Sequence, residues 1–181
     1  LREDIITDGR HAEVKFSKDW KKDASRRDFT INAIYSDKEG NLFDPYNGKE
    51  DLEKGEINFI GSVEKRVQED YLRILRYIRF FLNYSKKKHD PQIIKFIRMN
   101  LDGISKLSKD RLIDELKKIL YLKTLVNLSK DKFSLEIIKV IFPQLKYFNS
   151  FTKLNSHAYN ISKEDDFIFF ISLLIIDETD N

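Results

Sequence analysis

The clearest helical pattern in the chain runs from Glu69 to Phe80 and contains neither glycine nor proline. Apolar residues recur along it at helical spacing, as Leu72, Leu75 and Ile78. The pattern therefore predicts a helix with one buried face, which we place over residues 69–84.

The charged residues of this helix also recur at a fixed interval. Asp70, Arg73, Arg76 and Arg79 stand three positions apart, and residues at that spacing are neighbours on a helix surface. Three guanidiniums this close repel one another, so the row suits an anionic or planar ligand. Arginine donates to phosphates and base edges, and aspartate accepts from an exocyclic amine. The alternative is a solvated helix face on which Asp70 and Arg73 form an ordinary surface pair.

Shorter patterns predict the remaining elements. Ala12–Phe16 alternates like a half-buried strand, and Thr30–Ser36 with Leu42–Phe43 predicts a hairpin. A short helical turn is expected from Leu52 to Gly55, and one more short strand near residues 57–60. Beyond Ser62 the pattern becomes helical, and we expect helices near residues 62–68, 69–84, 90–100, 108–121, 123–130, 133–141 and 163–176.

These elements predict an α+β fold. A small part with short strands, residues 1–60, precedes an all-helical part. The chain has 181 residues, of which 41% are hydrophobic, so a sizeable core can form. It contains no cysteine, which excludes thiolate zinc sites and fits the cytoplasm. The apolar run at residues 167–176 is too short to span a bilayer, so no membrane partner is expected.

The net charge of +3 is unevenly distributed along the chain. Residues 61–120 hold 15 Lys and Arg against 8 Asp and Glu, a net charge of +7, and include the arginine row. A basic excess confined to one segment is typical of a nucleic-acid or polyphosphate contact. His11, His89 and His157 are scattered without metal-ligand spacing, so we interpret all three as surface or structural residues and predict no metal site.

Four segments in order resemble the class II tRNA nucleotidyltransferase (CCA-adding enzyme) and bacterial poly(A) polymerase family. Arg26–Ala33 reads RRDFTINA, Asp44–Leu52 reads DPYNGKEDL, and Glu69–Arg76 fits the family's ED-x-x-R-x-LR helix. Leu107–Leu116 is similar to a later helix of the same family. The resemblance covers about residues 1–120 and implies part of a nucleotidyltransferase head at 1–60, a nucleotide-reading helical neck at 61–121 and a helical body at 122–181.

The resemblance also implies roles for individual residues. Asp70 and Arg73 would read the incoming base, and Arg76 and Arg79 would contact the nucleotide, most plausibly its phosphates. A structural alternative pairs these last two arginines with neck carboxylates such as Glu64 or Glu69. The remaining nucleotide-binding residues implied by the family are Arg26, Arg27 and Asp28, which would contact ribose and phosphate.

No catalytic residue is expected within these 181 residues. The family's metal-binding Asp-x-Asp and its Gly-Gly loop lie N-terminal to the matched segments, and the chain contains neither pattern. Two-metal transfer needs such carboxylates. We therefore expect a fragment that is inactive alone, with Mg²⁺ held by residues outside it.

The predicted function is addition of CCA to the tRNA 3′ end from CTP and ATP. The alternatives are a poly(A) polymerase, an enzyme that adds only part of the triplet, and a non-catalytic RNA- or nucleotide-binding remnant. The sequence leaves the oligomeric state open.

Overall fold

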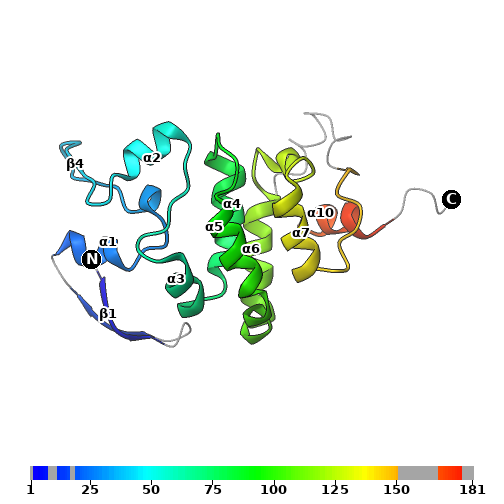
Figure 1. Cartoon of the computed structure of the whole chain (residues 1–181), viewed down its shortest axis with the longest axis horizontal. Coiled ribbons are helices and arrows are strands. Elements are labelled where there is room, and N and C mark those ends of the chain that lie inside the picture. The colour runs from blue at the N-terminus through cyan, green and yellow to red at the C-terminus, as the bar shows by residue number, and fades with distance from the viewer. Residues whose placement is uncertain (1, 8–11, 17–18, 151–166, 177–181) are drawn as a thin grey trace. The chain divides into compact units, whose positions relative to one another are not determined.

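The computed structural model describes residues 2–7, 12–16, 19–150 and 167–176 (Figure 1). The chain divides into two compact units, Leu1–Leu107 and Ser108–Asn181. Within the described residues all four strands belong to the first unit, whereas the second is helical. This confirms the predicted α+β class. The expected functional boundaries after residues 60 and 121 stay predictions.

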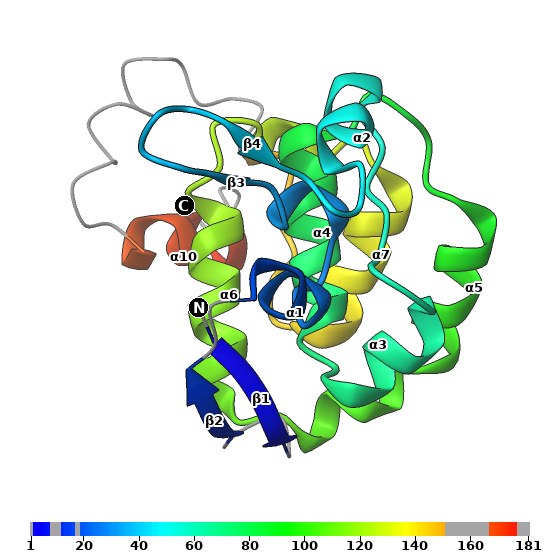
Figure 2. The ribbon, with the colours of Figure 1, turned by 90° about the vertical axis from the view of Figure 1, so that its left-hand side faces the viewer.

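The strands form two separate antiparallel pairs, which Figure 2 shows as distinct ribbons. Strand β1 (Arg2–Thr7) pairs with β2 (Ala12–Phe16), and the register shifts once within β1. The alternation predicted β2, but β1 has no comparable pattern and was missed. Strands β3 (Tyr35–Ser36) and β4 (Leu42–Phe43) form the predicted hairpin, in a shorter version.

The first half of the expected hairpin strand is instead a 3₁₀ turn, η1 (Thr30–Asn32). The Asn32 side chain accepts a hydrogen bond from the backbone N–H of Phe29 at 3.2 Å, which favours a local turn over a strand. Phe29 is fully buried and forms an isolated antiparallel bridge with Phe59, within the short strand expected near residues 57–60. This bridge places the end of the RRDFTINA segment against the chain that leads into the helices.

The second motif folds onto the first. Helix α2 (Gly48–Lys54) begins four residues earlier than predicted and ends at Gly55, which has a positive φ of 70°. Asp51 accepts a hydrogen bond from the Thr30 hydroxyl at 2.6 Å. Gly48 packs against the Thr30 backbone so closely that a Cβ there would lie 2.1 Å from the carbonyl oxygen. The second motif, Asp44–Leu52, therefore packs against η1, the turn that follows the Arg-Arg-Asp triplet, and stabilises it.

The predicted helix over residues 69–84 is wrong at its start. Helix α3 (Val63–Glu69) ends at Glu69, and α4 runs from Arg73 to Tyr84. Asp70 between them is extended, with φ −154° and ψ 107°, and its carboxylate accepts from the backbone N–H of Leu72 at 3.1 Å. Aspartate side chains that bond the local backbone in this way compete with helix formation. Asp70 therefore lies in a turn before the helix that carries the arginines.

An aromatic cluster holds α4 against the RRDFTINA segment. The ring of Phe29 lies 4.8 Å from that of Phe59 and 5.0 Å from that of Phe80, between centroids. Tyr77 is also buried here and stacks on Phe59 at 5.8 Å. Burying aromatic rings of this size is a major source of stability. The remaining elements of the unit are α1 (Trp20–Ser25), α5 (Pro91–Met99) and η2 (Leu101–Lys106).

The second unit contains α6 (Lys109–Leu120), η3 (Leu125–Asn127), α7 (Lys132–Ile141) and α10 (Phe167–Ile175). Of the helix expected at 123–130 only η3 and flanking turns form, and residues 163–166 of the last predicted helix lie outside the described residues. The carbonyl of Leu174 accepts from two backbone N–H groups, which ties α10 to the segment after α7. No helix in the described ranges is long and apolar enough to cross a membrane.

Candidate nucleotide-binding site

A carboxylate from the first motif lies between two arginines of α4. Asp28 Oδ1 accepts from Arg73 Nε at 2.8 Å, and Oδ2 accepts from Arg76 Nε at 2.5 Å. Only 11% of the Asp28 side chain is exposed, so the carboxylate is held away from most of the solvent. A buried charge needs such partners, and two guanidiniums provide them. The structure thus joins two motifs that are far apart in the sequence.

The guanidinium of Arg73 is fixed on two of its three nitrogens. Nη1 donates to Glu69 Oε2 at 2.6 Å and to the carbonyl of Arg66 at 2.7 Å, while Nε is bound to Asp28. Burial alone would lower the pKa of Arg73, but the hydrogen bonds to Glu69 and Asp28 raise it overall. Nη2 makes no hydrogen bond to any residue that the structure describes. Arg73 therefore keeps one NH₂ group for a ligand.

The guanidinium of Arg76 forms fewer hydrogen bonds than that of Arg73. Its Nε bonds Asp28, its side chain is 31% exposed, and neither terminal nitrogen has a hydrogen bond within the described part of the chain. Because Asp28 orients both guanidiniums, Arg73 and Arg76 together offer three terminal NH₂ groups. This arrangement can bind acceptors such as phosphate oxygens or the ring and carbonyl acceptors of a base.

Arg26 and Arg27 gather around a carboxylate that was not among the predicted site residues. Asp23 is 2% exposed and accepts from Arg26 at 2.6 Å, from Arg27 at 3.2 Å and from the hydroxyl of Tyr35 at 2.7 Å. Asp23 precedes the two arginines by three and four residues. That is the spacing of neighbours on a helix, so the sequence did contain a signal for this cluster.

The aromatic residue of this cluster completes its geometry. Arg27 Nε donates to the Tyr35 hydroxyl at 3.1 Å, and the guanidinium lies 5.3 Å from the ring centroid of the same residue. Burial would lower the pKa of Arg27, but the hydrogen bonds to Tyr35 and Asp23 raise it. Burial and the hydrogen bond to Asp23 raise the pKa of Tyr35. Tyr35 and Asp23 therefore stabilise the charged form of Arg27.

The other two predicted residues, Asp70 and Arg79, lie before Arg73 and after Arg76 in the sequence. Asp70 lies in the turn before α4, and the guanidinium of Arg79 lies 4.7 Å from the ring centroid of Phe80. The structural alternative that pairs Arg76 with a neck carboxylate is not what the structure shows, because its ion pair is with Asp28. Glu69 instead binds Arg73 and Arg66.

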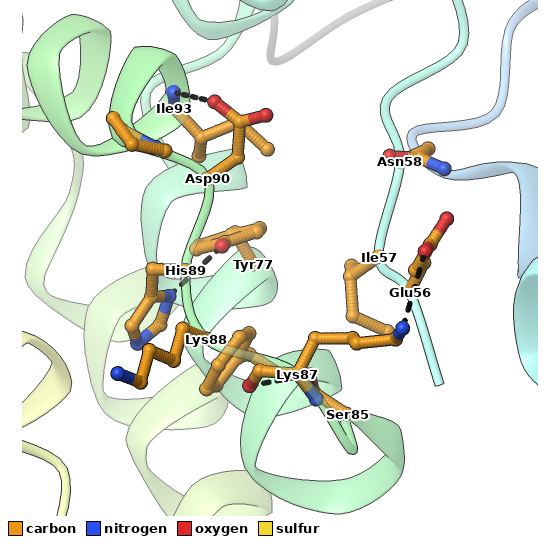
Figure 3. A pocket seen from close by; sticks show the side chains of 12 residues that line it. Glu56, Ile57, Asn58, Tyr77, Ser85, Lys87, Lys88, His89, Asp90 and Ile93 are labelled. Atoms are coloured by element: carbon orange, nitrogen blue, oxygen red, sulfur yellow. Dashed lines mark hydrogen bonds and ion pairs between the residues drawn. The ribbon is translucent and has the colours of Figure 1, made fainter. Parts of the chain in front are cut away.

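A cavity of about 340 Å³ lies elsewhere in the first unit (Figure 3). None of the seven predicted nucleotide-binding residues lines it. On its wall the Tyr77 hydroxyl lies 2.9 Å from Nδ1 of His89, and the imidazole stacks on Phe81 at 3.5 Å. Both neighbours hold the imidazole in place, and a structural role for His89 stays a prediction. Among the described residues no group of three or more His, Asp or Glu could hold a metal ion, so none is assigned to magnesium.

Two family models match the segments of the chain before and after α4. Residues 1–58 match the model described as "Poly A polymerase head domain", and residues 88–149 match "Probable RNA and SrmB-binding site of polymerase A". The human protein named "CCA tRNA nucleotidyltransferase 1, mitochondrial" is 51% identical over 122 residues, covering 66% of this chain and 28% of that protein. The chain belongs to the family of CCA-adding enzymes and bacterial poly(A) polymerases.

Solved structures of CCA-adding enzymes agree with this membership. The Bacillus stearothermophilus enzyme in complex with CTP is 29% identical, has a TM-score of 0.59, and the match covers 70% of this chain and 30% of that one. A CCA-adding enzyme in apo form II has a TM-score of 0.73 at 23% identity, over 99% of this chain and 45% of that one, and shows the shared fold. The predicted family is confirmed. Because the chain spans only 28% of its human relative, the activity of the whole protein is a matter for proposal.

Proposed function

We propose that this chain is the nucleotide-selecting portion of a template-independent RNA nucleotidyltransferase that adds CCA to tRNA 3′ ends from CTP and ATP. The supporting observation is the contact between Asp28 and the two arginines of α4. It brings the ribose- and phosphate-contacting motif of the family next to its base-reading helix. The relatives named as CCA-adding enzymes support the same reaction.

In this proposal Arg73 and Asp70 select the base. Nη2 of Arg73, which has no hydrogen-bond partner among the described residues, donates to ring and carbonyl acceptors, and Asp70 accepts from the exocyclic amine. C and A both carry this amine where G and U carry a carbonyl. A carboxylate has about four lone-pair sites, so accepting from Leu72 does not by itself prevent Asp70 from accepting from a base amine. One Asp/Arg pair can therefore serve both substrates.

The other predicted residues hold the rest of the nucleotide. Arg76 offers both terminal nitrogens to phosphate, and Arg79 adds a further cation on the same helix. Arg26, Arg27 and Asp28 contact ribose and phosphate. Asp28 can do so while it holds the two α4 arginines, since each of its oxygens has a lone pair in addition to the one in use.

The metal ion, the RNA partner and the cellular location are proposed for the complete protein. We propose Mg²⁺ as the activating metal, bound outside the described residues, and the tRNA 3′ end as the RNA partner. The proposed location is the cytoplasm, although the human relative carries "mitochondrial" in its name, and fractionation with an antibody to the complete protein decides between the two.

The test is an incorporation assay with the complete polypeptide that carries this chain. tRNA transcripts lacking one, two or three nucleotides of the terminal CCA are incubated with single and mixed nucleoside triphosphates. We expect CTP to be added to transcripts that end before either C, and ATP only after both. Long A tails made without CTP would favour the poly(A) polymerase alternative, which the descriptions of the family models also raise. Nucleotide binding without incorporation would favour the non-catalytic remnant.

A further inference from the structure

One arginine outside the predicted site contacts three segments that build it. Arg66, on α3, donates from Nε to the carbonyl of Ile60 at 2.7 Å, from Nη1 to Glu69 Oε2 at 3.1 Å, and from Nη2 to the carbonyl of Ser25. All three nitrogens of its guanidinium are therefore engaged. Its side chain is only 15% exposed. These contacts are unlike those of an ordinary surface arginine.

The contacts of Arg66 close a ring through the nucleotide site. Ile60, whose carbonyl Arg66 holds, donates its backbone N–H to the carbonyl of Asp28 at 3.0 Å. The Asp28 carboxylate holds Arg73, and Arg73 Nη1 returns to the backbone carbonyl of Arg66 at 2.7 Å. Every link in this ring is a hydrogen bond. A shift of the Arg66 side chain therefore changes the position of Asp28 and of Arg73 together.

Glu69 forms a second bridge between the same two arginines. Its Oε2 accepts from Arg66 and from Arg73, at 3.1 and 2.6 Å. The three groups alternate in charge, so the carboxylate compensates the repulsion between the two guanidiniums. The Arg73 guanidinium is thus fixed from both sides, by Asp28 and by Glu69. Within the part of the chain that the structure describes, Nη2 is the one nitrogen of this guanidinium without a hydrogen bond.

We propose that Arg66 is a positioning residue that sets base selectivity through Arg73, without touching the nucleotide itself. This inference rests on the proposed function for its catalytic consequence. Hydrogen-bond donors that are held in one position can distinguish one base from another. A guanidinium that is able to rotate can also donate to the acceptors of incorrect bases. Arg66 restricts that rotation because its side chain binds Ile60 and Glu69, while its backbone carbonyl accepts from Arg73.

The conservative variant Arg66→Lys tests whether the geometry of the Arg66 guanidinium matters in addition to its positive charge. Lysine keeps the positive charge but donates from a single nitrogen, so it cannot span the three acceptors that arginine reaches from three nitrogens. Glu69→Gln is the second variant: it keeps an acceptor, removes the charge and lies on a half-exposed side chain, so the fold should tolerate it. Lys65→Ala, an exposed residue one position away on α3, is the matched control.

The first measurement reads the position of Arg73 directly, by the ¹H–¹⁵N NMR signal of its Nε–H group, assigned by its loss in Arg73→Lys. We expect the signal to shift or broaden in Arg66→Lys, to change less in Glu69→Gln, and to stay unchanged in Lys65→Ala. A signal that is the same in wild type, Arg66→Lys and Glu69→Gln overturns the positioning role. This measurement needs no enzymatic activity.

The second measurement is the ratio of kcat/KM for CTP and ATP to that for UTP and GTP, in the complete polypeptide. We expect the ratio to fall about tenfold in Arg66→Lys, the scale of one lost hydrogen bond to a charged group. The thermal midpoint should fall, because the carbonyls of Ile60 and Ser25 lose a donor, whereas the KM for the correct nucleotide should change little. If wild type is active and Arg66→Lys keeps the same selectivity ratio as wild type, the positioning role of Arg66 is overturned. A wild type that adds no nucleotide contradicts the proposed function instead, and the NMR result then decides the role of Arg66.

Discussion

Arg73 donates its Nε hydrogen to Asp28 at 2.8 Å, across 45 residues of sequence. The pair links the last residue of the Arg-Arg-Asp triplet to the first residue of α4. Since Arg76 binds the other oxygen of the same carboxylate, Asp28 orients two of the three arginines in the predicted row. The site is therefore organised by a carboxylate in the head segment as well as by the helix itself.

Replacing Arg73 should change which nucleotide is chosen more than how tightly phosphate is held. In Arg73→Ala the NH₂ group proposed to read the base is lost, whereas Arg76 and Arg79 remain. We expect the preference for CTP and ATP over UTP and GTP to drop by at least about tenfold, as for the loss of a specific hydrogen bond. Single-nucleotide incorporation kinetics measure this ratio. Equal weakening for all four nucleotides would remove the base-reading role.

Asp28→Asn should destabilise the first unit. The amide keeps the shape of the side chain but presents one acceptor where two guanidiniums now bind. We expect a loss of about 1–3 kcal/mol in the free energy of unfolding, measured by urea titration. Asp102→Asn, at an exposed position in η2, is the control and should change stability by less than about 0.5 kcal/mol. Equal stability of the two variants would show that the Asp28 contacts do not support the fold.

Acid should remove the contribution of Glu69. Burial would raise the pKa of this carboxyl, but hydrogen bonds from Arg73 and Arg66 lower it below its ordinary value of 4.5. A group whose pKa is lowered on folding stabilises the protein above its unfolded pKa and loses that effect as the pH falls through its folded pKa. The thermal midpoint of wild type should therefore exceed that of Glu69→Gln near neutral pH.

This difference should shrink as the pH falls below about 4.5, because a protonated Glu69 resembles glutamine. Thermal unfolding of both proteins between neutral and strongly acidic pH measures it. Glu53→Gln, which removes an exposed pair with Lys49, should differ little from wild type throughout. A Glu69→Gln difference that is constant with pH would contradict the ion-pair account.

Gly48→Ala should disrupt the contact between the first two motifs. The added Cβ would lie 2.1 Å from the Thr30 carbonyl oxygen, and backbone at that position cannot yield without moving η1. We expect a loss of about 2–4 kcal/mol in stability. Gly61→Ala is the comparison, since its φ of 85° is unfavourable for alanine but no atom lies within 4 Å, so it should cost about 1 kcal/mol. Similar losses for the two variants would contradict the close-packing explanation.

The sequence predicted those features that depend on local pattern. The alternation at Ala12–Phe16, the hairpin turn before Leu42 and the helical period at 108–121 all correspond to observed elements. Prediction from the sequence was wrong where a side chain forms a hydrogen bond with the nearby backbone. Asn32 turns an expected strand into η1, and Asp70 breaks an expected helix, although neither break carries a glycine or proline.

The candidate site shows a similar division. Spacing and family resemblance identified the arginines of α4, but not the Asp28 carboxylate that binds two of them across 45 and 48 residues of sequence. Such tertiary pairing has no period in the sequence, because it depends on how α4 packs against the Phe29 segment. The ring of contacts through Arg66 could not be predicted for the same reason, since two of its partners are backbone carbonyls.

The central claim is that Asp70 and Arg73 take the place of a template strand. The most direct test is a crystal structure of the complete polypeptide with bound CTP and another with bound ATP. We predict Arg73 Nη2 and the Asp70 carboxylate within about 3 Å of the base in both, with the carboxylate facing the exocyclic amine. A base bound without either contact, with Arg73 still satisfied only by Asp28 and Glu69, would contradict the account.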